Sequence, residues 1–271
     1  FILEEYHDLK SYGQGGKINK EALIAANPDV IIMYGEINDS EKESADILED
    51  DTGIPVVMVD GSLEKSPEAY RFLGEKVFNM KERTDILATY AEEALEFAEE
   101  IKTTYADKKV KLYYGNGPDS LETTPIGSTH AELFVLIGAV NVCDLELNAK
   151  GRVEASHEHI IAWNPDIVLI NGEPKGDKKI SPKMAVDNFK SDERFQTINA
   201  VINDRVYAIP NYPYTWIDRP QSTNRLLGIY WLAYILYDHD SIDVNEEAKT
   251  FYELFYHWDL TDEELTLLLG K

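Results

Sequence analysis

A loop rich in aromatic residues and proline is the first candidate for ligand contact. Residues 210–220 hold three aromatic side chains at alternate positions, Tyr212, Tyr214 and Trp216. An extended segment points alternate side chains to one side, so the three rings would form one face. Rigid aromatic surface beside one cation, Arg219, suits a flat or anionic ligand. The alternative is that the rings pack inward as the core of the loop.

A second long loop covers residues 115–125. A compact connector needs only a few residues, and surplus length usually serves a function. We therefore add to the candidate site four residues of this loop, the tyrosine that ends an early strand and a histidine that opens the following helix: Asn116, Gly117, Glu122, Thr123, Tyr34 and His130. His130 could donate to a ligand or coordinate one. Its alternative role is that of a neutral histidine covering the start of a helix.

Motifs for catalysis are missing from the chain. We find no GxGxxG, GxxxxGK[ST], GxSxG or HExxH pattern. A single histidine without a spaced partner is weak support for a metal ion, so we predict no metal ligands. Glu36 and Glu173 lie in different halves of the chain and more simply end two strands. We predict that the protein is not an enzyme and holds no cofactor.

Composition narrows the class of partner. The 271 residues include 26 basic and 50 acidic ones, and the net charge of −24 would repel nucleic acid and anionic lipid. The longest uncharged apolar stretch, residues 226–237, is too short to cross a bilayer as a helix. The start of the chain shows no targeting signal. The one cysteine, Cys143, sits in an apolar run and is expected to be a buried thiol.

A repeated segment organises the rest of the chain. Residues 21–36 return as residues 158–173 without a gap, and eight of the sixteen positions are identical. Each copy reads as the end of a helix, an Asn-Pro-Asp break and a continuous apolar run. Such a run is typical of a parallel strand that is buried on both faces. The repeat predicts two similar α/β lobes; the alternative is chance similarity of two α/β units.

A long helix is expected between the two copies. Residues 81–105 contain neither glycine nor proline, and their apolar residues recur at helical spacing. At the α-helical rise such a helix reaches ~37 Å, enough to run along a whole lobe and connect it to the next. We predict an N-terminal lobe over 1–80, a connecting helix over 81–106 and a C-terminal lobe over 107–271. The alternative is an ordinary packing helix within one domain.

The elements also predict where a ligand binds. In open parallel sheets, ligands bind outside the carboxyl ends of the strands, where the loops emerge. The loops at 115–125 and 211–219 both follow predicted strands of the second lobe. We therefore expect the candidate residues to converge on one cleft.

The chain resembles a family, the substrate-binding proteins of ABC importers for iron–siderophore complexes, haem and cobalamin. The similarity rests on both Asn-Pro-Asp units, on Gly127-Ser-Thr-His-Ala-Glu with the following Ile-Gly-Ala-Val-Asn-Val, and on Asp218-Arg-Pro before a long helix. The resemblance implies an α/β fold of two Rossmann-like lobes with parallel-type sheets joined by a single long helix. The first lobe of such proteins carries a further strand and helix before the position of Phe1, so we expect that lobe to lack them.

The resemblance also implies a function: capture of a metal chelate outside the cytoplasm and its delivery to a dimeric ABC permease. Family members dock through one glutamate per lobe, and the matching positions are Glu21 and Glu158. A monomer is expected, in the periplasm or lipid-anchored at the outer face of the membrane, without nucleic-acid partners.

The ligand implied is less specific. Several tyrosines and one arginine favour an anionic ferric siderophore-type complex. Haem, a corrinoid, a nickel or cobalt chelate and molybdate or tungstate are the alternatives within the same fold. Two other classes stay open: a histidine-based zinc or manganese binding protein, and a two-lobed nucleotide-sugar enzyme.

Overall fold

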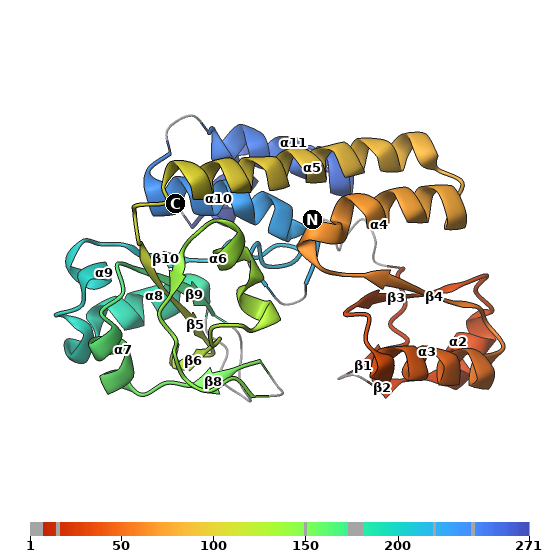
Figure 1. The fold of residues 1–271 in the computed structure, drawn as a ribbon, viewed down its shortest axis with the longest axis horizontal. Helices are drawn as coiled ribbons and strands as arrows, with labels where there is room; N and C mark the ends of the chain where they lie inside the picture. The colour runs from red at the N-terminus through yellow and green to blue at the C-terminus, as the bar shows by residue number, and fades with distance from the viewer. Residues whose placement is uncertain are drawn as a thin grey trace. The chain divides into compact units, whose positions relative to one another are not determined.

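The polypeptide folds into two units, and the boundary between them falls inside one helix. The computed structural model describes residues 8–14, 17–148, 151–172, 181–218, 221–239 and 242–270. Unit 1 is Phe1–Ala91 and unit 2 is Glu92–Lys271. Helix α5, Lys81–Thr104, runs unbroken through this boundary (Figure 1). The predicted α/β fold with a long connecting helix is confirmed.

Unit 1 contains a small parallel sheet covered by helices. Its elements are β1 (Gly13–Gln14), β2 (Lys17–Ile18), α2 (Lys20–Ala26), β3 (Ile31–Gly35), α3 (Asp39–Thr52), β4 (Val56–Asp60), η1 (Leu63–Lys65), α4 (Ser66–Phe72) and η2 (Leu73–Val77). Strands β3 and β4 pair in parallel, with Ile31 opposite Val56, and α3 packs on β4. The prediction that the first repeat strand is buried on both faces is wrong, because β3 residues are half-buried or exposed. Because the sheet described around β3 has only two strands, it cannot bury β3 on both faces.

The Asn-Pro-Asp break has the same backbone geometry in both copies. Helix α2 ends at Asn27 with φ 49°, and helix α7 (His157–Trp163) ends at Asn164 with φ 45°. Both asparagines are left-handed, a conformation that asparagine tolerates better than most residues. The proline that follows disfavours a right-handed helical residue before it. Asparagine and proline together therefore stop each helix and send the chain into a strand.

Unit 2 is built on a sheet of six described strands. The order is β10 (Val206–Ala208), β9 (Ile167–Asn171), β5 (Lys111–Asn116), β6 (Glu122–Thr123) and β8 (Val153–Glu154), and β7 (Val140–Asn141) also pairs with β5. Strands β10, β9, β5 and β7 are parallel, while β6 and β8 pair antiparallel. Every residue of β9 is buried, as predicted for the second copy of the repeat.

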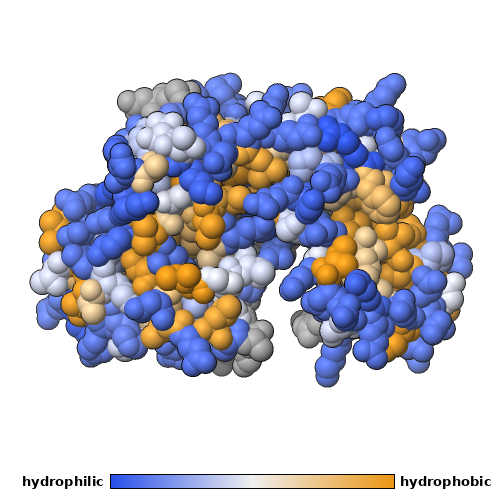
Figure 2. Space-filling view, viewed as in Figure 1, coloured by the Kyte–Doolittle hydropathy of each residue, from blue (hydrophilic) through white to orange (hydrophobic). Residues whose placement is uncertain are grey.

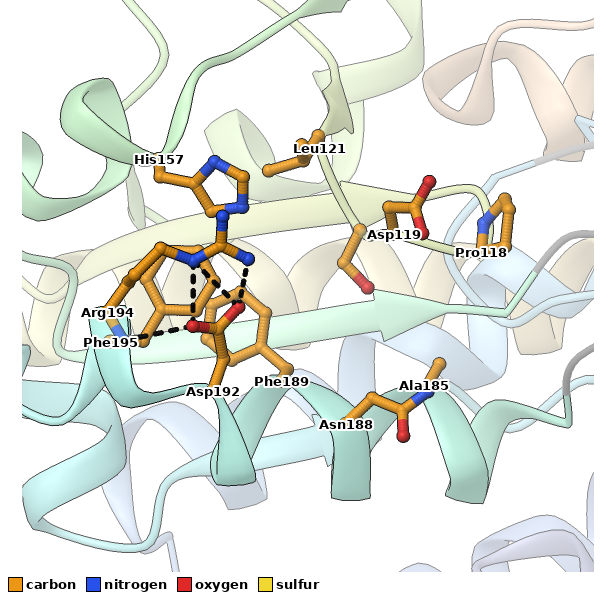
Figure 3. Close-up of a pocket in the computed structure, with 11 residues that line it drawn as sticks. Pro118, Asp119, Leu121, His157, Ala185, Asn188, Phe189, Asp192, Arg194 and Phe195 are labelled. Carbon is orange, nitrogen blue, oxygen red and sulfur yellow. Dashed lines mark hydrogen bonds and ion pairs between the residues drawn. The ribbon is translucent and has the colours of Figure 1, made fainter.

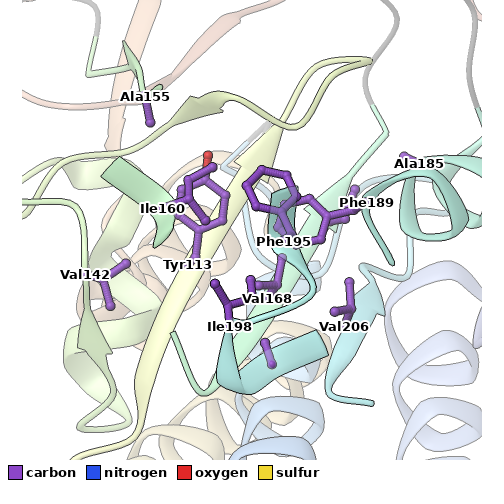
Figure 4. Packing of buried hydrophobic residues seen from close by; sticks show 12 residues of the cluster. Tyr113, Val142, Ala155, Ile160, Val168, Ala185, Phe189, Phe195, Ile198 and Val206 are labelled. Atoms are coloured by element: carbon purple, nitrogen blue, oxygen red, sulfur yellow. The ribbon is translucent and has the colours of Figure 1, made fainter. Parts of the chain in front are cut away.

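Helices surround this sheet. They are α6 (Glu132–Leu136), α7, α8 (Pro182–Ser191), α9 (Asn199–Ile202), α10 (Asn224–Tyr237), α11 (Val244–Tyr256) and α12 (Asp262–Leu268), with 3-10 turns η3 (Thr129–Ala131) and η4 (Glu193–Phe195). Helix α8 packs on β9 and β10. In the core cluster of Figure 4, the rings of Phe189 and Phe195 stack 4.3 Å apart beside Val168 of β9. Burial of each large apolar side chain contributes about 1.5–3 kcal/mol.

Small residues line the buried side of the long helix. Ala88, Ala91, Ala94 and Ala98 of α5 are almost fully buried. In unit 2 the end of this helix packs against α10, where the rings of Tyr105 and Tyr237 stack 4.4 Å apart. No helix among the described residues has the length and apolar character of a membrane span. Figure 2 shows hydrophilic side chains over much of the visible face of each unit, with apolar patches among them.

Candidate ligand site at the carboxyl edge of the unit 2 sheet

A histidine and a buried aspartate join two of the candidate loops. Nδ1 of His130 lies 2.9 Å from Oδ1 of Asp218. The Asp218 side chain is 2% exposed and the His130 side chain 23%. Ser128 accepts a hydrogen bond from the His130 backbone N–H and so begins the turn that carries the ring. If Nδ1 donates to the carboxylate, Nε2 is the ring nitrogen that can accept a proton or a ligand atom.

The aromatic loop is folded rather than extended. The backbone N–H of Trp216 donates to the carbonyl of Pro210 at 3.0 Å, and Asn211 forms a bridge with Thr215. Trp216 is 0% exposed and Tyr214 is 44% exposed. The alternation therefore does not put the three rings on one face, because the loop turns back on itself. Trp216 is therefore a core residue. Inward packing is the alternative to ligand contact that was given above for the three rings.

Trp216 is enclosed by helices α10 and α11. Its ring lies edge-on to Trp231 at 6.4 Å, and its Nε1–H donates to the hydroxyl of Tyr252 at 3.4 Å. That hydroxyl donates to the carbonyl of Tyr212. Burial raises the pKa of Tyr252, so the hydroxyl stays protonated as the donor of this bond.

One residue that the sequence reasoning missed ties the loop to α10. Asn224 is fully buried, and its Nδ2 donates to the carbonyls of Tyr214 at 3.0 Å and Tyr212 at 3.4 Å. Its Oδ1 accepts from the hydroxyl of Tyr256. One turn later, Gly228 lets the loop approach: a Cβ there would lie 1.8 Å from the carbonyl oxygen of Trp216. Tyr212 and Tyr214 thus have a fixed backbone.

The residues of the 115–125 loop are mostly covered. Asn116 and Thr123 are 0% exposed and Gly117 is buried. Asn171, at the end of β9, donates from Nδ2 to Oδ1 of Asn116 at 3.3 Å. These side chains brace the carboxyl ends of two neighbouring strands.

A chain of contacts links this loop to His130. Glu122 is half-buried, and its Oε2 lies 3.8 Å from Nη1 of Arg152. The neighbouring Gly151 has a φ of +67°, and a Cβ on it would come within 2.7 Å of Cδ2 of His130. Glycine therefore allows this segment to lie directly against the imidazole. His130 thus contacts Asp218 of the 210–218 loop directly, while loop 115–125 is connected to it through Arg152 and Gly151.

A buried ion pair lies next to the same turn. Nη1 of Arg225, whose side chain is 2% exposed, lies 2.6 Å from Oε2 of Glu132. Arg225 is the charged residue in a helix that is otherwise apolar apart from Asn224, and this signal could have identified it from the sequence. The pair holds the start of α10 to α6 and balances its own charge.

Other candidate residues lie elsewhere or outside the description. Arg219 and Glu173 lie outside the described residues. Tyr34 belongs to unit 1, is exposed, and its hydroxyl donates to the carbonyl of Gly61 at 3.4 Å. Glu21 and Glu158 are both exposed in the first turns of α2 and α7. Among the described residues, no three His, Cys, Asp or Glu side chains form a set that could hold a metal ion.

One protein-family profile matches most of the chain. The profile of the family described as "Periplasmic binding protein" matches residues 2–213. An ABC transporter solute binding protein from Sulfurospirillum deleyianum is 29% identical, with a TM-score of 0.81, and the match covers 97% of this chain and 79% of that one. A search of curated proteins finds no match.

Two further structures share the fold at lower identity. A periplasmic solute binding protein from Veillonella parvula is 23% identical with a TM-score of 0.78, over 98% of this chain and 78% of that one. A molybdate-bound periplasmic binding protein from Haemophilus influenzae is also 23% identical, with a TM-score of 0.71, over 96% and 82% of the two chains.

Proposed function

Because the chain belongs to the periplasmic binding protein family of ABC transporters, we propose that it captures a ferric siderophore-type chelate and delivers it to an ABC permease. Family membership implies a place outside the cytoplasm and a role in binding rather than catalysis. Beyond family membership, we propose the nature of the ligand and the residues that contact it.

The contact between His130 and Asp218 carries the proposal. It brings an imidazole of one loop against the loop of Tyr212 and Tyr214. Because Asn224 fixes the backbone of both tyrosines, Tyr214 can offer its exposed ring without a large loss of conformational entropy on binding. An aromatic ring, an imidazole and the arginine that follows Asp218 in the sequence suit a ligand that is partly apolar and partly anionic.

Arg219 is the cation that we assign to the ligand. Of the arginines that the structure describes around His130, Arg152 lies in an ion pair with Glu122 and Arg225 in one with Glu132. Neither pair adds net positive charge to the site. A ferric chelate with negative charge therefore depends on Arg219, one residue beyond Asp218.

A titration series tests the ligand class. Ferric catecholate and ferric hydroxamate chelates, haem, cobalamin and molybdate are titrated separately and followed by intrinsic tryptophan fluorescence. The proposal expects saturable binding of a ferric chelate, with Arg219→Ala weakening it by about tenfold to a hundredfold. Lys183→Ala, which removes an exposed cation of α8, is the control. Saturable binding of molybdate, haem or cobalamin alone would replace the ligand class and leave the family role intact.

Delivery is proposed to use Glu21 and Glu158. Both lie in the first turn of a repeat helix, and both are exposed. Each would pair with an arginine of one permease subunit; an exposed pair contributes only ~0–1 kcal/mol, so the two set orientation more than affinity. In proteoliposomes that hold the permease, Glu21→Ala and Glu158→Ala should lower chelate uptake while chelate affinity stays the same. Unchanged chelate uptake in the double variant Glu21→Ala/Glu158→Ala would rule out docking through these two glutamates.

A further inference from the structure

The two repeat helices, α2 in unit 1 and α7 in unit 2, carry the same side chains on one face. The helix positions that are identical in both copies make up this face: Glu21, Ile24 and Ala25 in α2, and Glu158, Ile161 and Ala162 in α7. At 3.6 residues per turn, three such positions fall within about 100° of the helix circumference. The positions that differ lie on the other side: Ala22, Leu23 and Ala26 against His159, Ile160 and Trp163.

Equivalent backbone frames present the shared side chains. Asn19 caps α2 by accepting a hydrogen bond from the backbone N–H of Ala22, and Ser156 caps α7 in the same way through the N–H of His159. Both helices then end at the left-handed asparagine before the proline. The glutamate, the isoleucine and the alanine therefore occupy equivalent positions on the two helices.

The shared side chains lie at the surface of their own units. Ile24 is 49% exposed and Ile161 is 38% exposed, and both glutamates and both alanines are exposed as well. The inward position, by contrast, holds Leu23 in one copy and the fully buried Ile160 in the other. Packing within a unit thus accepts a change of apolar side chain, and it does not account for identity at the exposed positions.

Basic residues beside each helix are engaged mainly by other carboxylates. Lys20, directly before Glu21, forms an ion pair with Asp51 of α3. Beside α7, Arg194 and His157 line a pocket of about 310 Å³, and Nε of Arg194 donates to Oδ1 of Asp192 at 2.9 Å (Figure 3). The pKa of Arg194 is raised first by its hydrogen bond to Asp192, then by the charge of Asp192 and last by that of Glu158. Each shared face therefore combines an exposed isoleucine with a carboxylate that can attract a cation of a partner.

We propose that Ile24 and Ile161 are apolar docking contacts, each of which enters an apolar recess of one permease subunit beside a basic residue that pairs with the adjacent glutamate. The inference rests on the docking role proposed for Glu21 and Glu158. Single exposed apolar residues are common on protein surfaces, but here the same one accompanies the same glutamate in both units. Two copies of one contact set fit a partner that presents the same surface twice, as a two-fold dimer does.

The three shared side chains would divide the work of docking. Removal of the isoleucine from water supplies affinity, whereas an exposed ion pair mainly sets orientation. Ala25 and Ala162 lie one residue beyond the isoleucines on the same face. Their small side chains let the surface of the permease approach the helix closely.

Binding to the cognate permease, reconstituted in nanodiscs, tests the inference. Ile24→Ser and Ile161→Ser should each weaken permease binding by about fivefold to tenfold, because an apolar side chain leaves the interface. The double variant should weaken binding by about the product of the two factors, since contacts in different units act independently. Ala25→Gln and Ala162→Gln, which keep a good helix former but add bulk to the face, should weaken binding too.

Exposed apolar residues of other helices provide the controls. Ile86→Ser in α5 and Leu267→Ser in α12 remove side chains that are 53% and 76% exposed. Each should change permease affinity by less than about twofold, because most surface positions outside an interface centre contribute little. Chelate affinity and the midpoint of thermal unfolding should be unchanged in every variant, so that weaker permease binding reports the lost contact and not unfolding.

The outcomes separate this inference from the docking proposal. If Glu21→Ala and Glu158→Ala weaken permease binding while both isoleucine variants bind like the original protein, the inference fails and docking through the glutamates stands. If only the isoleucine variants weaken binding, the apolar contact stands and docking through the glutamates fails. Normal binding by all four variants overturns both proposals. The inference is also overturned if one isoleucine variant alone weakens binding, or if the controls weaken it as much as the isoleucine variants do.

Discussion

His130 and Asp218 form a hydrogen-bonded pair, with Nδ1 2.9 Å from Oδ1, although 88 positions separate them in the chain. The pair fastens the turn before α6 to the aromatic loop before α10. Because Asp218 is almost fully buried, its carboxylate relies on the imidazole and on the folded loop around it.

The first prediction concerns this pair. His130→Ala should destabilise unit 2 by about 1.5–3 kcal/mol, because a buried carboxylate then loses one of its hydrogen bonds. Asp218→Asn should cost less, since an amide oxygen can still accept from Nδ1. Urea unfolding followed by circular dichroism measures both. Equal stability of the two variants and the original protein would show that the contact is not structural.

A second prediction separates the aromatic residues of the loop. Trp216→Ala should lower the free energy of unfolding by about 3–5 kcal/mol, because it empties a fully buried site. Tyr214→Ala should leave stability within about 0.5 kcal/mol and weaken chelate binding about threefold to tenfold. Thermal unfolding and chelate titration on the same samples test both statements. A destabilised Tyr214→Ala with normal affinity would make this ring structural too.

The third prediction is about Gly228. Helix propensity alone would favour alanine in the middle of α10 by roughly 0.5–1 kcal/mol. A Cβ at this position would lie 1.8 Å from the carbonyl oxygen of Trp216, so Gly228→Ala should instead destabilise by about 1–3 kcal/mol. Gly35→Ala, where a Cβ meets nothing within 4 Å, is the control for added side-chain bulk. A stabilised Gly228→Ala would mean that the loop can move away.

The fourth prediction follows from the pKa of Glu158. A hydrogen bond with Ser156, the backbone at Glu158 and the two flanking histidines lower this pKa below the ordinary value of 4.5. A lowered pKa in the folded state favours folding above the unfolded pKa, and this contribution disappears as pH falls through the folded pKa. At pH 5–7 Glu158 should stay ionised and available for docking.

NMR titration of the Glu158 side chain measures this directly. Ser156→Ala should move the pKa of Glu158 back toward 4.5, while permease binding at pH 5 and pH 7 should be alike in the original protein. If Ser156→Ala leaves the pKa of Glu158 unchanged, the hydrogen bond with Ser156 is not the main cause of the lowered pKa.

Several elements were predictable because they depend on local sequence. Asn27 and Asn164 precede prolines, so the helix stops of both repeat units could be located without a structure. The long helix could be predicted because residues 81–105 hold no helix breaker, and α5 spans Lys81–Thr104. The burial of β3 could not be predicted, because burial of a strand depends on how many neighbours its sheet has.

The candidate site was predictable only in outline. The sequence pointed to His130 and to the loop of Tyr212 and Tyr214, since long loops after strands meet at the carboxyl edge of a sheet. The inward turn of Trp216 could not be predicted, because it depends on Pro210, Tyr252 and α10. Asn224 was missed for the same reason: its three partners lie in two other segments.

The sequence by itself determined the α/β class, the repeated units, the long helix and the list of loops that could bind a ligand. These follow from patterns that act over a few neighbouring residues, such as helical spacing, proline and apolar runs. Only the tertiary structure decided which side chains face outward, which pair with each other and that a pocket lies beside Glu158. Those properties arise when segments far apart in the chain pack together, and a local pattern carries no information about its distant partner.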